Sequence, residues 1–130
     1  MKLLIDNNLP PVLGRGLGAL FEGRHHIQHI KDKFGRGNLP DMEWIEALGS
    51  EGDWCVLSGD RNIAKKRPSR DAFLNAGLIG FFPLPAVMSL PLHRQAARVL
   101  TIWPAIEATA SAIERGCFEL GISGRLRQIS

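Results

Sequence analysis

Four short segments in the first two thirds of the chain have the length and the flanking turns of β-strands, at residues 2–5, 25–30, 53–57 and 78–82. The segment 53–57 shows no alternation of apolar and polar positions, which is expected for a strand with both faces covered. Between these segments the apolar residues recur three or four positions apart, as they do on one face of a helix. The pattern therefore predicts strands and helices in alternation.

Three helices are predicted between the strands. The first opens at Pro10-Pro11, where proline is tolerated in the first turn of a helix. The second begins at Pro40 or Asp41, and the third covers residues 63–76. The residues expected on the buried faces are Leu13, Leu17, Leu20 and Phe21 in the first helix and Met42, Ile45 and Leu48 in the second.

Loops and proline residues divide the rest of the chain. Residues 31–39 are polar with glycine, and residues 83–92 are rich in proline, so both segments are predicted to be loops. Residues 92–115 are predicted to form a long helix that Pro104 kinks or breaks. The final segment 117–129 is predicted to form a β-hairpin.

The repeated order of strand, helix and strand predicts an α/β fold with a mostly parallel central sheet flanked by helices. The chain has 130 residues, 45% of them hydrophobic, which suits a single domain over residues 1–130. In such folds, functional sites form beyond the carboxyl ends of the strands. Asp6 follows the first predicted strand, Asp60 follows the third, and Asp41 opens a helix. We therefore expect the three carboxylates to lie together at this end of the sheet.

The composition predicts a soluble protein of a reducing cytoplasm. The two cysteines, Cys55 and Cys117, are too few for a disulfide scaffold and are expected to be buried thiols. Residues 72–92 carry no charge over a length close to that of a membrane span. Three prolines within that stretch argue against a continuous lipid-facing helix, so no membrane association is expected.

The net charge is +3, and its distribution is more informative than its sum. Cations beside an acidic centre suit a polyanionic substrate, because the cations hold phosphates while the carboxylates hold metal. The alternative is a solvated helix face. The basic group directly after Asp60 consists of Arg61, Lys65, Lys66, Arg67 and Arg70.

Three carboxylates on separate elements, with no histidine or cysteine beside them, favour a hard cation such as Mg²⁺ or Mn²⁺. Such an ion removes the repulsion among the carboxylates, ionises a water and stabilises a phosphoryl transition state. Taken singly, Asp6, Asp41 and Asp60 also suit turn residues or helix caps. Glu43 is a candidate for a secondary ligand and ranks below Asp41, because successive helix positions diverge by about 100°.

Several stretches resemble the PIN-like toxin families. Residues 3–10, LLIDNNLP, are similar to the apolar strand of these families followed by Asp and then Asn-Leu-Pro. Residues 41–45, DMEWI, resemble their second Asp and the helix after it, and residues 56–63, VLSGDRNI, resemble their strand-Thr/Ser-x-Asp element. The resemblance is closest to the VapC-like branch, through Gly-Asp-x-x-Ile and the strand GLIGFF at residues 77–82, and it covers about residues 1–85.

The resemblance implies a PIN-like three-layer sandwich and a metal-dependent endoribonuclease, typically the toxin of a type II toxin–antitoxin pair. Asp6, Asp41 and Asp60 match the metal-binding, catalytic carboxylates of the family. These residues would cleave single-stranded or structured RNA by means of a metal-activated water, and a cognate antitoxin would be the protein partner. The residues expected to hold the RNA backbone are Arg61, Lys65 and Lys66.

The sequence departs from the family pattern at one position. Typical members carry a fourth acid on the helix after the first strand, whereas Glu22, the only acid in that stretch, falls at the helix end. Asn8 or Asn62 is a candidate to complete the ligand set through an amide oxygen. The alternative hypothesis is therefore a catalytically degenerate PIN-like module that binds RNA or a protein partner without cleavage.

Other motifs permit competing interpretations. GRGLGA at residues 14–19 matches a dinucleotide fingerprint, with Asp32 as the ribose-binding acid, but it does not follow its strand directly. Zinc binding by the histidines of residues 25–30 lacks a further ligand, and an aspartyl nucleophile for phosphate monoesters lacks the second aspartate of a DxD element. Exposed apolar surface at Trp103 or at residues 83–92 is a candidate contact for a homodimer or an antitoxin.

Overall fold

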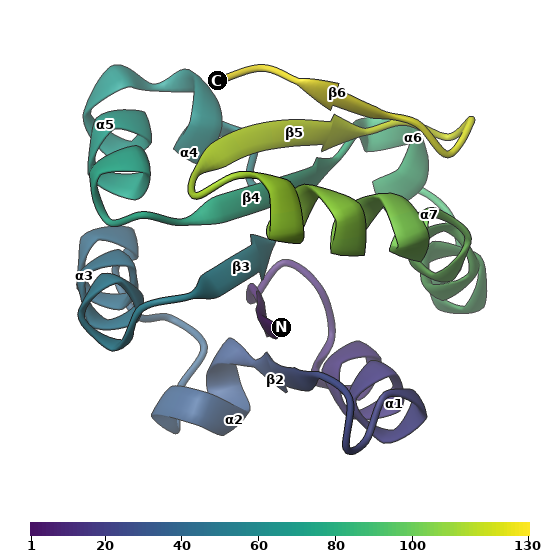
Figure 1. Ribbon diagram of the computed structural model, residues 1–130. Coiled ribbons are helices and arrows are strands. Elements are labelled where there is room, and N and C mark those ends of the chain that lie inside the picture. The colour runs from purple at the N-terminus through teal and green to yellow at the C-terminus, as the bar shows by residue number, and fades with distance from the viewer.

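A six-stranded sheet organises the computed structural model, which describes all of residues 1–130 (Figure 1). The strands follow the order β2-β1-β3-β4-β5-β6 across the sheet. The first five run parallel, and β6 pairs antiparallel with β5 where the sequence predicts a hairpin. The strands are β1 (Lys2–Ile5), β2 (His26–His29), β3 (Trp54–Leu57), β4 (Ile79–Pro83), β5 (Gly116–Leu120) and β6 (Leu126–Gln128).

Helices cover both faces of this sheet. Two helices, α1 and α7, pack on one face, and α3, α4 and α5 pack on the other, while α2 and α6 are short and follow β2 and β4. The predicted α/β fold, with a mostly parallel sheet between two layers of helices, is thereby confirmed. The helices are α1 (Pro11–Leu20), α2 (Ile30–Phe34), α3 (Asp41–Glu51), α4 (Asn62–Lys65), α5 (Arg67–Asn75), α6 (Pro85–Met88) and α7 (Leu92–Ala112).

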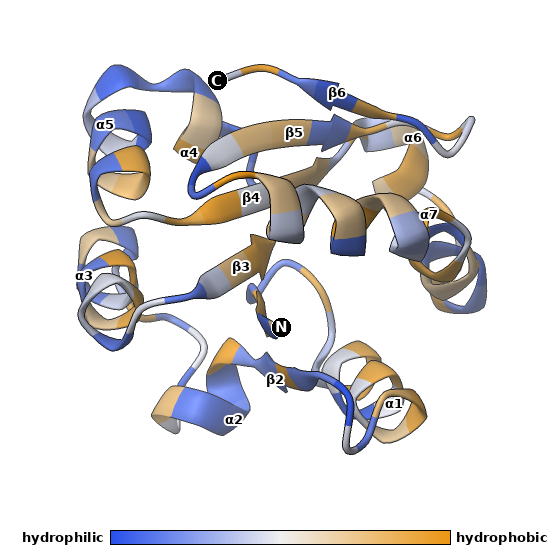
Figure 2. Cartoon of the chain, viewed as in Figure 1, coloured by the Kyte–Doolittle hydropathy of each residue, from blue (hydrophilic) through white to orange (hydrophobic).

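Alternation along the central strands divides the hydrophobic core into two halves. Leu3 and Ile5 of β1 belong to the buried cluster under α1 and α7, whereas Leu4 between them belongs to the cluster under α3, α4 and α5. Hydrophobic residues are concentrated on β3, β4 and the helix faces, whereas β6 at the edge of the sheet is largely hydrophilic (Figure 2). The inner strands are therefore buried on both faces, as predicted for residues 53–57.

The connection between β4 and β5 differs in hand from the three connections before it. Both α3 and α5 lie on one face while the chain moves across the sheet from β2 to β3 and on to β4. The next step, from β4 to β5, continues in the same direction, but its helix α7 lies on the opposite face, beside α1. Crossover connections of parallel strands are almost always of one hand, so this layer arrangement is unusual.

The segment 31–39 is not entirely a loop, and that part of the prediction was wrong. The short helix α2 occupies its beginning, where His29 Nδ1 accepts a hydrogen bond of 3.0 Å from the backbone N–H of Lys31. Gly35 ends the helix in the left-handed region, with φ of 80°. A histidine ring that caps a helix has no strong sequence signal, which explains why the pattern missed it.

The single helix predicted over 63–76 is divided into α4 and α5. Lys66 has an extended backbone, with φ of −82° and ψ of 124°, between the two. A proline inside a helix removes a hydrogen bond and clashes with the carbonyl four residues earlier. The helix restarts after Lys66, so Pro68 falls in the first turn of α5. A similar restart produces α6, with Pro85 at its start, inside the predicted loop 83–92.

Three predictions about burial were wrong. Leu20 and Met42, expected on buried helix faces, are 65% and 53% exposed. Trp103, considered as exposed interface, is buried, and its ring stacks on Phe21 with the centroids 4.3 Å apart. The helix α7 continues through Pro104, and its axis changes direction along its length (Figure 1).

Both cysteines are buried, as expected, and neither forms a disulfide. Burial raises the pKa of the Cys55 thiol to about 12 and that of Cys117 to about 11, so both stay protonated at neutral pH. No helix has both the length and the apolar character needed to cross a membrane.

The glycines of α1 differ in what surrounds them, and this difference predicts opposite effects of alanine. A Cβ at Gly16 would meet nothing within 4 Å, whereas at Gly14 it would lie 3.0 Å from the backbone N of His29. We expect Gly16→Ala to raise the free energy of unfolding by about 1 kcal/mol, because alanine is the better helix former. Gly14→Ala should lower it, because the backbone of β2 must move. Urea unfolding of both variants measures the change in the free energy of unfolding. A lower value for Gly16→Ala would contradict the finding that a Cβ at this position has open space around it.

Candidate metal centre

The candidate site lies where the order of the sheet reverses. The chain leaves β1 towards β2 on one side and later returns to β3 on the other side of β1. In parallel α/β sheets, ligands bind in the crevice beyond the carboxyl ends of the strands at such a reversal. Asp6 and Ser58 directly follow β1 and β3, and the N–H of Asp6 donates to the carbonyl of Leu57 at 3.0 Å. Asp6 therefore lies at this crevice.

Ser58 joins two of the predicted site residues. Its hydroxyl donates to Oδ2 of Asp6 at 2.8 Å and accepts from the backbone N–H of Asp60 at 3.0 Å. Ser58 is fully buried, so these bonds are not in competition with water. Ser58 was not among the predicted site residues, although it is the serine of the strand-Thr/Ser-x-Asp element in the sequence. Asp6 and Asp60 are thus held by one side chain.

The side-chain amide of Asn8 is hydrogen-bonded to the turn after β3, so its oxygen is already in use and not free to bind a metal. Its Oδ1 accepts from the backbone N–H of Gly59 at 2.8 Å, and its Nδ2 lies 3.5 Å from Oγ of Ser58. Asn62 is exposed, and its backbone N–H donates to Oδ1 of Asp60 at 3.1 Å at the start of α4. The two asparagine positions considered as ligands thus shape the loops around Asp6 and Asp60.

Asp41 belongs to the same electrostatic environment. It is the first residue of α3, and its Oδ1 accepts from Nε1 of Trp44 at 3.1 Å. Partial burial raises the pKa of Asp41, the Trp44 hydrogen bond acts against this rise, and the charges of Asp6 and Asp60 raise it further. The three aspartates therefore interact across one end of the sheet.

The donor set suits a hard divalent cation. All three side chains offer carboxylate oxygens, and a cation between them would remove the repulsion that raises the pKa of Asp41. No group of three or more His, Cys, Asp or Glu side chains is close enough to enclose an ion directly. The carboxylate oxygens are thus of the chemical type that Mg²⁺ prefers, but their spacing does not form a closed ligand set.

The other acids considered do not join this group. Glu43 is exposed, and its Oε2 lies 3.8 Å from Nη2 of Arg36. Glu22 follows the end of α1 and lines a shallow hollow with His26, beside the start of β2. It therefore lies at the opposite end of the strands from Asp6, and α1 carries no acid in its first turn.

The predicted basic residues are arranged around a buried carboxylate. Glu119 of β5 is only 2% exposed, and it forms ion pairs with Arg61 and with Arg127 of β6. The hydrogen bond from Arg127 and that from Arg61 hold the pKa of Glu119 below its ordinary value despite burial. Lys65 lines the hollow beside this cluster, whereas Lys66 is exposed and does not. Glu119 was not among the predicted site residues, because it interacts with residues distant in sequence such as Arg61.

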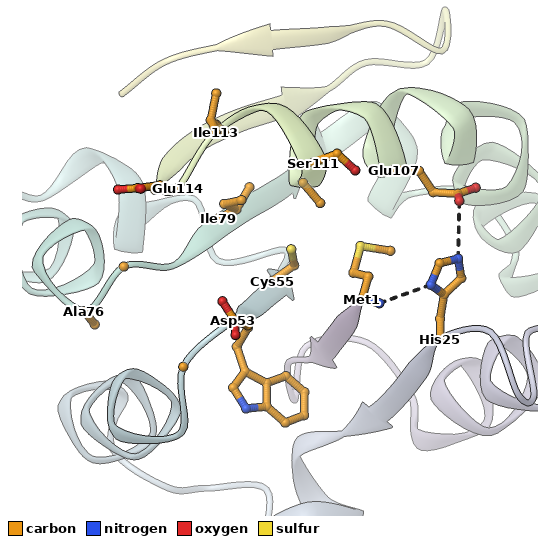
Figure 3. Close-up of a pocket in the computed structure, with 14 residues that line it drawn as sticks. Met1, His25, Asp53, Cys55, Ala76, Ile79, Glu107, Ser111, Ile113 and Glu114 are labelled. Atoms are coloured by element: carbon orange, nitrogen blue, oxygen red, sulfur yellow. Dashed lines mark hydrogen bonds and ion pairs between the residues drawn. The ribbon is translucent and has the colours of Figure 1, made fainter.

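A cavity of about 610 Å³ lies at the other end of the sheet, at the amino ends of β1, β3 and β4 (Figure 3). Nε2 of His25 lies 3.4 Å from Oε2 of Glu107 at its margin, and the carboxylates of Asp53 and Glu114 lie around it. Functional sites in parallel sheets form beyond the carboxyl ends. The three aspartates therefore remain the candidate site, although none of them lines this cavity.

The competing motifs have structural roles. The glycines of residues 14–19 lie inside α1 and not in a loop after β1, and Arg15 pairs with Asp32 at 3.0 Å. His29 is buried, and its Nε2 donates to the carbonyl of Leu9 at 2.7 Å. The fingerprint thus lacks the strand–turn–helix geometry that a dinucleotide requires.

The structure is thus a mostly parallel sheet covered by helices on both faces, with aspartates beyond the carboxyl ends of its strands. Residues 1–83 match the family described as PIN-like domain, and the chain belongs to that family. PIN domains are generally nucleases that use divalent metals. The match is to this family and not to a VapC branch in particular. Comparison with curated proteins and with solved structures finds no match.

Proposed function

We propose that the chain is a Mg²⁺- or Mn²⁺-dependent endoribonuclease. The observation that carries the proposal is the placement of Asp6, Asp41 and Asp60 at the reversal of a PIN-like sheet, near enough that the first and last add to the effect of burial in raising the pKa of Asp41. Carboxylates brought close enough to repel one another are costly unless a cation compensates them. Such an arrangement is therefore better explained by function than by stability.

Each residue of the site has a proposed role. Asp6, Asp41 and Asp60 hold the divalent ion, which when bound supplies an ionised water and stabilises the charge of the phosphoryl transition state. Ser58 fixes Asp6 relative to the turn of Asp60 through its two hydrogen bonds. The RNA backbone is held by cations beside this centre, for which we propose Arg61, Lys65 and Lys66.

We further propose a biological setting for this activity. The sequence motifs resemble the VapC-like branch, so the chain would be the toxin of a type II toxin–antitoxin pair in the cytoplasm. Its partner would be a cognate antitoxin, and a homodimer is a second candidate assembly. A small DNA-binding protein encoded next to this chain, and a stable complex of the two on co-expression, would support this setting.

The activity is tested by cleavage of single-stranded RNA in Mn²⁺. We expect cleavage to stop when EDTA removes the metal and to fall by about 100-fold or more in Asp60→Asn. Asp53→Asn, the same chemical change at the opposite end of the sheet, is the matched control and should retain full activity. Equal activity of Asp60→Asn and the control would show that the site is wrongly assigned.

A module that binds RNA without cleaving it is the second candidate function. It is favoured by the first turn of α1, which lacks the fourth acid of typical PIN nucleases. RNA binding that is unaffected by EDTA, with no cleavage in Mg²⁺ or Mn²⁺, would select this function over the nuclease.

A further inference from the structure

A hollow of about 330 Å³ lies on the α4 and α5 side of β5 and β6, and its lining is strongly cationic. The sheet edge above it is hydrophilic at the carboxyl end of β5 and along β6 (Figure 2). One carboxylate, that of Glu119, faces four basic side chains in this hollow, so the local charge is strongly positive. The four are Arg61, Lys65, Arg70 and Arg127.

Glu119 holds two arginines from opposite sides of the hollow. Arg61 precedes α4 and Arg127 lies on β6, directly opposite Glu119 in the register of the strands. Both guanidinium groups bond to the two oxygens of this one carboxylate. A guanidinium has five N–H donors, so each arginine keeps donors that Glu119 does not use.

The cluster is pre-organised for an anion. Glu119 is fully buried and takes no part in the acidic centre, so its observed role is to position the arginines. Arg127 nevertheless remains 77% exposed, and its free donors are therefore accessible to a ligand. Arginines whose positions are already fixed lose less entropy when they bind an anion.

We infer that this hollow binds a phosphate of an RNA strand, through Arg127 and Arg70 together with Lys65 and Arg61. The inference rests on the proposed function for the identity of the strand. Arg61 directly follows Asp60, and β5 stands two strand spacings from β3, roughly 10 Å. The hollow is therefore near enough to hold the backbone a short way along the strand from the acidic centre. Planar guanidinium groups suit phosphate oxygens through paired hydrogen bonds.

Arg127→Ala is the direct test of the hollow, with binding measured in an Asp60→Asn background so that cleavage does not interfere. Fluorescence anisotropy of a labelled single-stranded RNA gives the affinity at several salt concentrations. We expect Arg127→Ala to weaken binding about fivefold near 0.1 M salt and to reduce the salt slope by about 0.7, the value for one phosphate contact. Arg115→Ala, which removes the same charge before β5, is the matched control and should change neither quantity.

Glu119→Gln separates an organised site from a merely positive surface. The substitution removes a negative charge, so a surface that attracts RNA by net charge alone would bind more tightly. We expect weaker binding instead, because the two arginines repel each other and lose their fixed positions. Circular dichroism of each variant establishes that it is folded, and Arg127→Lys should restore part of the affinity because it keeps the charge.

The outcomes distinguish this inference from the proposed nuclease activity. If the RNA affinity of Arg127→Ala equals that of Arg115→Ala, or if Glu119→Gln binds more tightly, the hollow is not a phosphate site. If inorganic phosphate binds and is lost in Arg127→Ala while RNA binding is unchanged, the ligand is a free anion and the inference fails. If the variants change RNA binding as expected but the parent chain never cleaves RNA, the phosphate site in the hollow is supported and the proposed nuclease activity is rejected.

Discussion

Asp6→Asn is expected to reduce RNA cleavage by on the order of 100- to 1000-fold, with little change in fold. Asparagine has nearly the same shape, but its single side-chain oxygen can replace only one of the two acceptors of Asp6, Oδ2 for the hydroxyl of Ser58 or Oδ1 for the backbone N–H of Asn7. The substitution removes the negative charge that the divalent ion requires. It also relieves the repulsion that adds to burial in raising the pKa of Asp41, which offsets part of the cost of the lost hydrogen bond, so the metal-free variant should stay folded.

Thermal unfolding with and without Mn²⁺ measures both consequences. A ligand that binds only the folded state raises the melting temperature, so Mn²⁺ should stabilise the parent chain and not Asp6→Asn. Asp71→Asn, at an exposed carboxylate of α5 that pairs with Arg67, is the control and should keep the Mn²⁺ response. An Asp6→Asn variant that is still stabilised by Mn²⁺ would mean that the ion binds elsewhere.

Trp44→Ala is expected to cost about 3–5 kcal/mol of the free energy of unfolding. Trp44 of α3 is fully buried, within the same cluster as Ile45 and Phe73. Removal of the indole leaves a cavity that the surrounding strands and helices cannot fill. The loss is a large part of the total stability of a domain of this size, so the variant should be partly unfolded near body temperature. Urea unfolding at several temperatures measures the change.

Trp44→Phe separates packing from the hydrogen bond to Asp41. The phenyl ring keeps most of the buried surface but donates nothing to Asp41 Oδ1, so the pKa of Asp41 should rise further above its ordinary value. Because a protonated Asp41 cannot hold a cation, Mn²⁺ binding should be lost at a higher pH in this variant as the solution is acidified. Trp54→Phe, which removes a comparable bond to Glu51, should leave that pH profile unchanged. If the two variants have the same pH profile of Mn²⁺ binding, the hydrogen bond of Trp44 does not affect the metal centre.

The strands could be predicted because their signals are local. Short apolar runs ending at Asp6 and at Ser58 define β1 and β3, and their order implied a parallel sheet. The element α2 was missed because its cap is the ring of His29, which is held by the carbonyl of Leu9 from another loop. Met42 was placed on the buried face because it is apolar, but Trp44 and its neighbours on α3 occupy that face. Apolar character alone does not decide which side of a helix is covered.

The candidate site was predictable only in part, for the same physical reason. Asp6 directly follows β1, Asp60 lies in the turn after β3 and Asp41 opens α3, so the sequence indicates their positions. Ser58 is small and common in turns, and only the contacts reveal that it joins two aspartates. Glu119 and Arg127 meet through the register of β5 and β6, and Arg61 joins them across 58 positions of sequence. Such a cluster has no local pattern.

The unusual hand of the β4–β5 connection determines how the core residues are shared between the part of the chain that matches the family and the part after it. All three aspartates lie within residues 1–83, the part that matches the family, but α7 lies outside it. Because α7 crosses to the face of α1, it is the helix that covers Leu57 and Phe81 there. The segment that carries the proposed metal centre therefore does not contain the whole core, because α7 and β5 supply six of the sixteen buried residues of the cluster on this face. Substitutions in the C-terminal third should therefore lower the stability of the folded site before they change its activity.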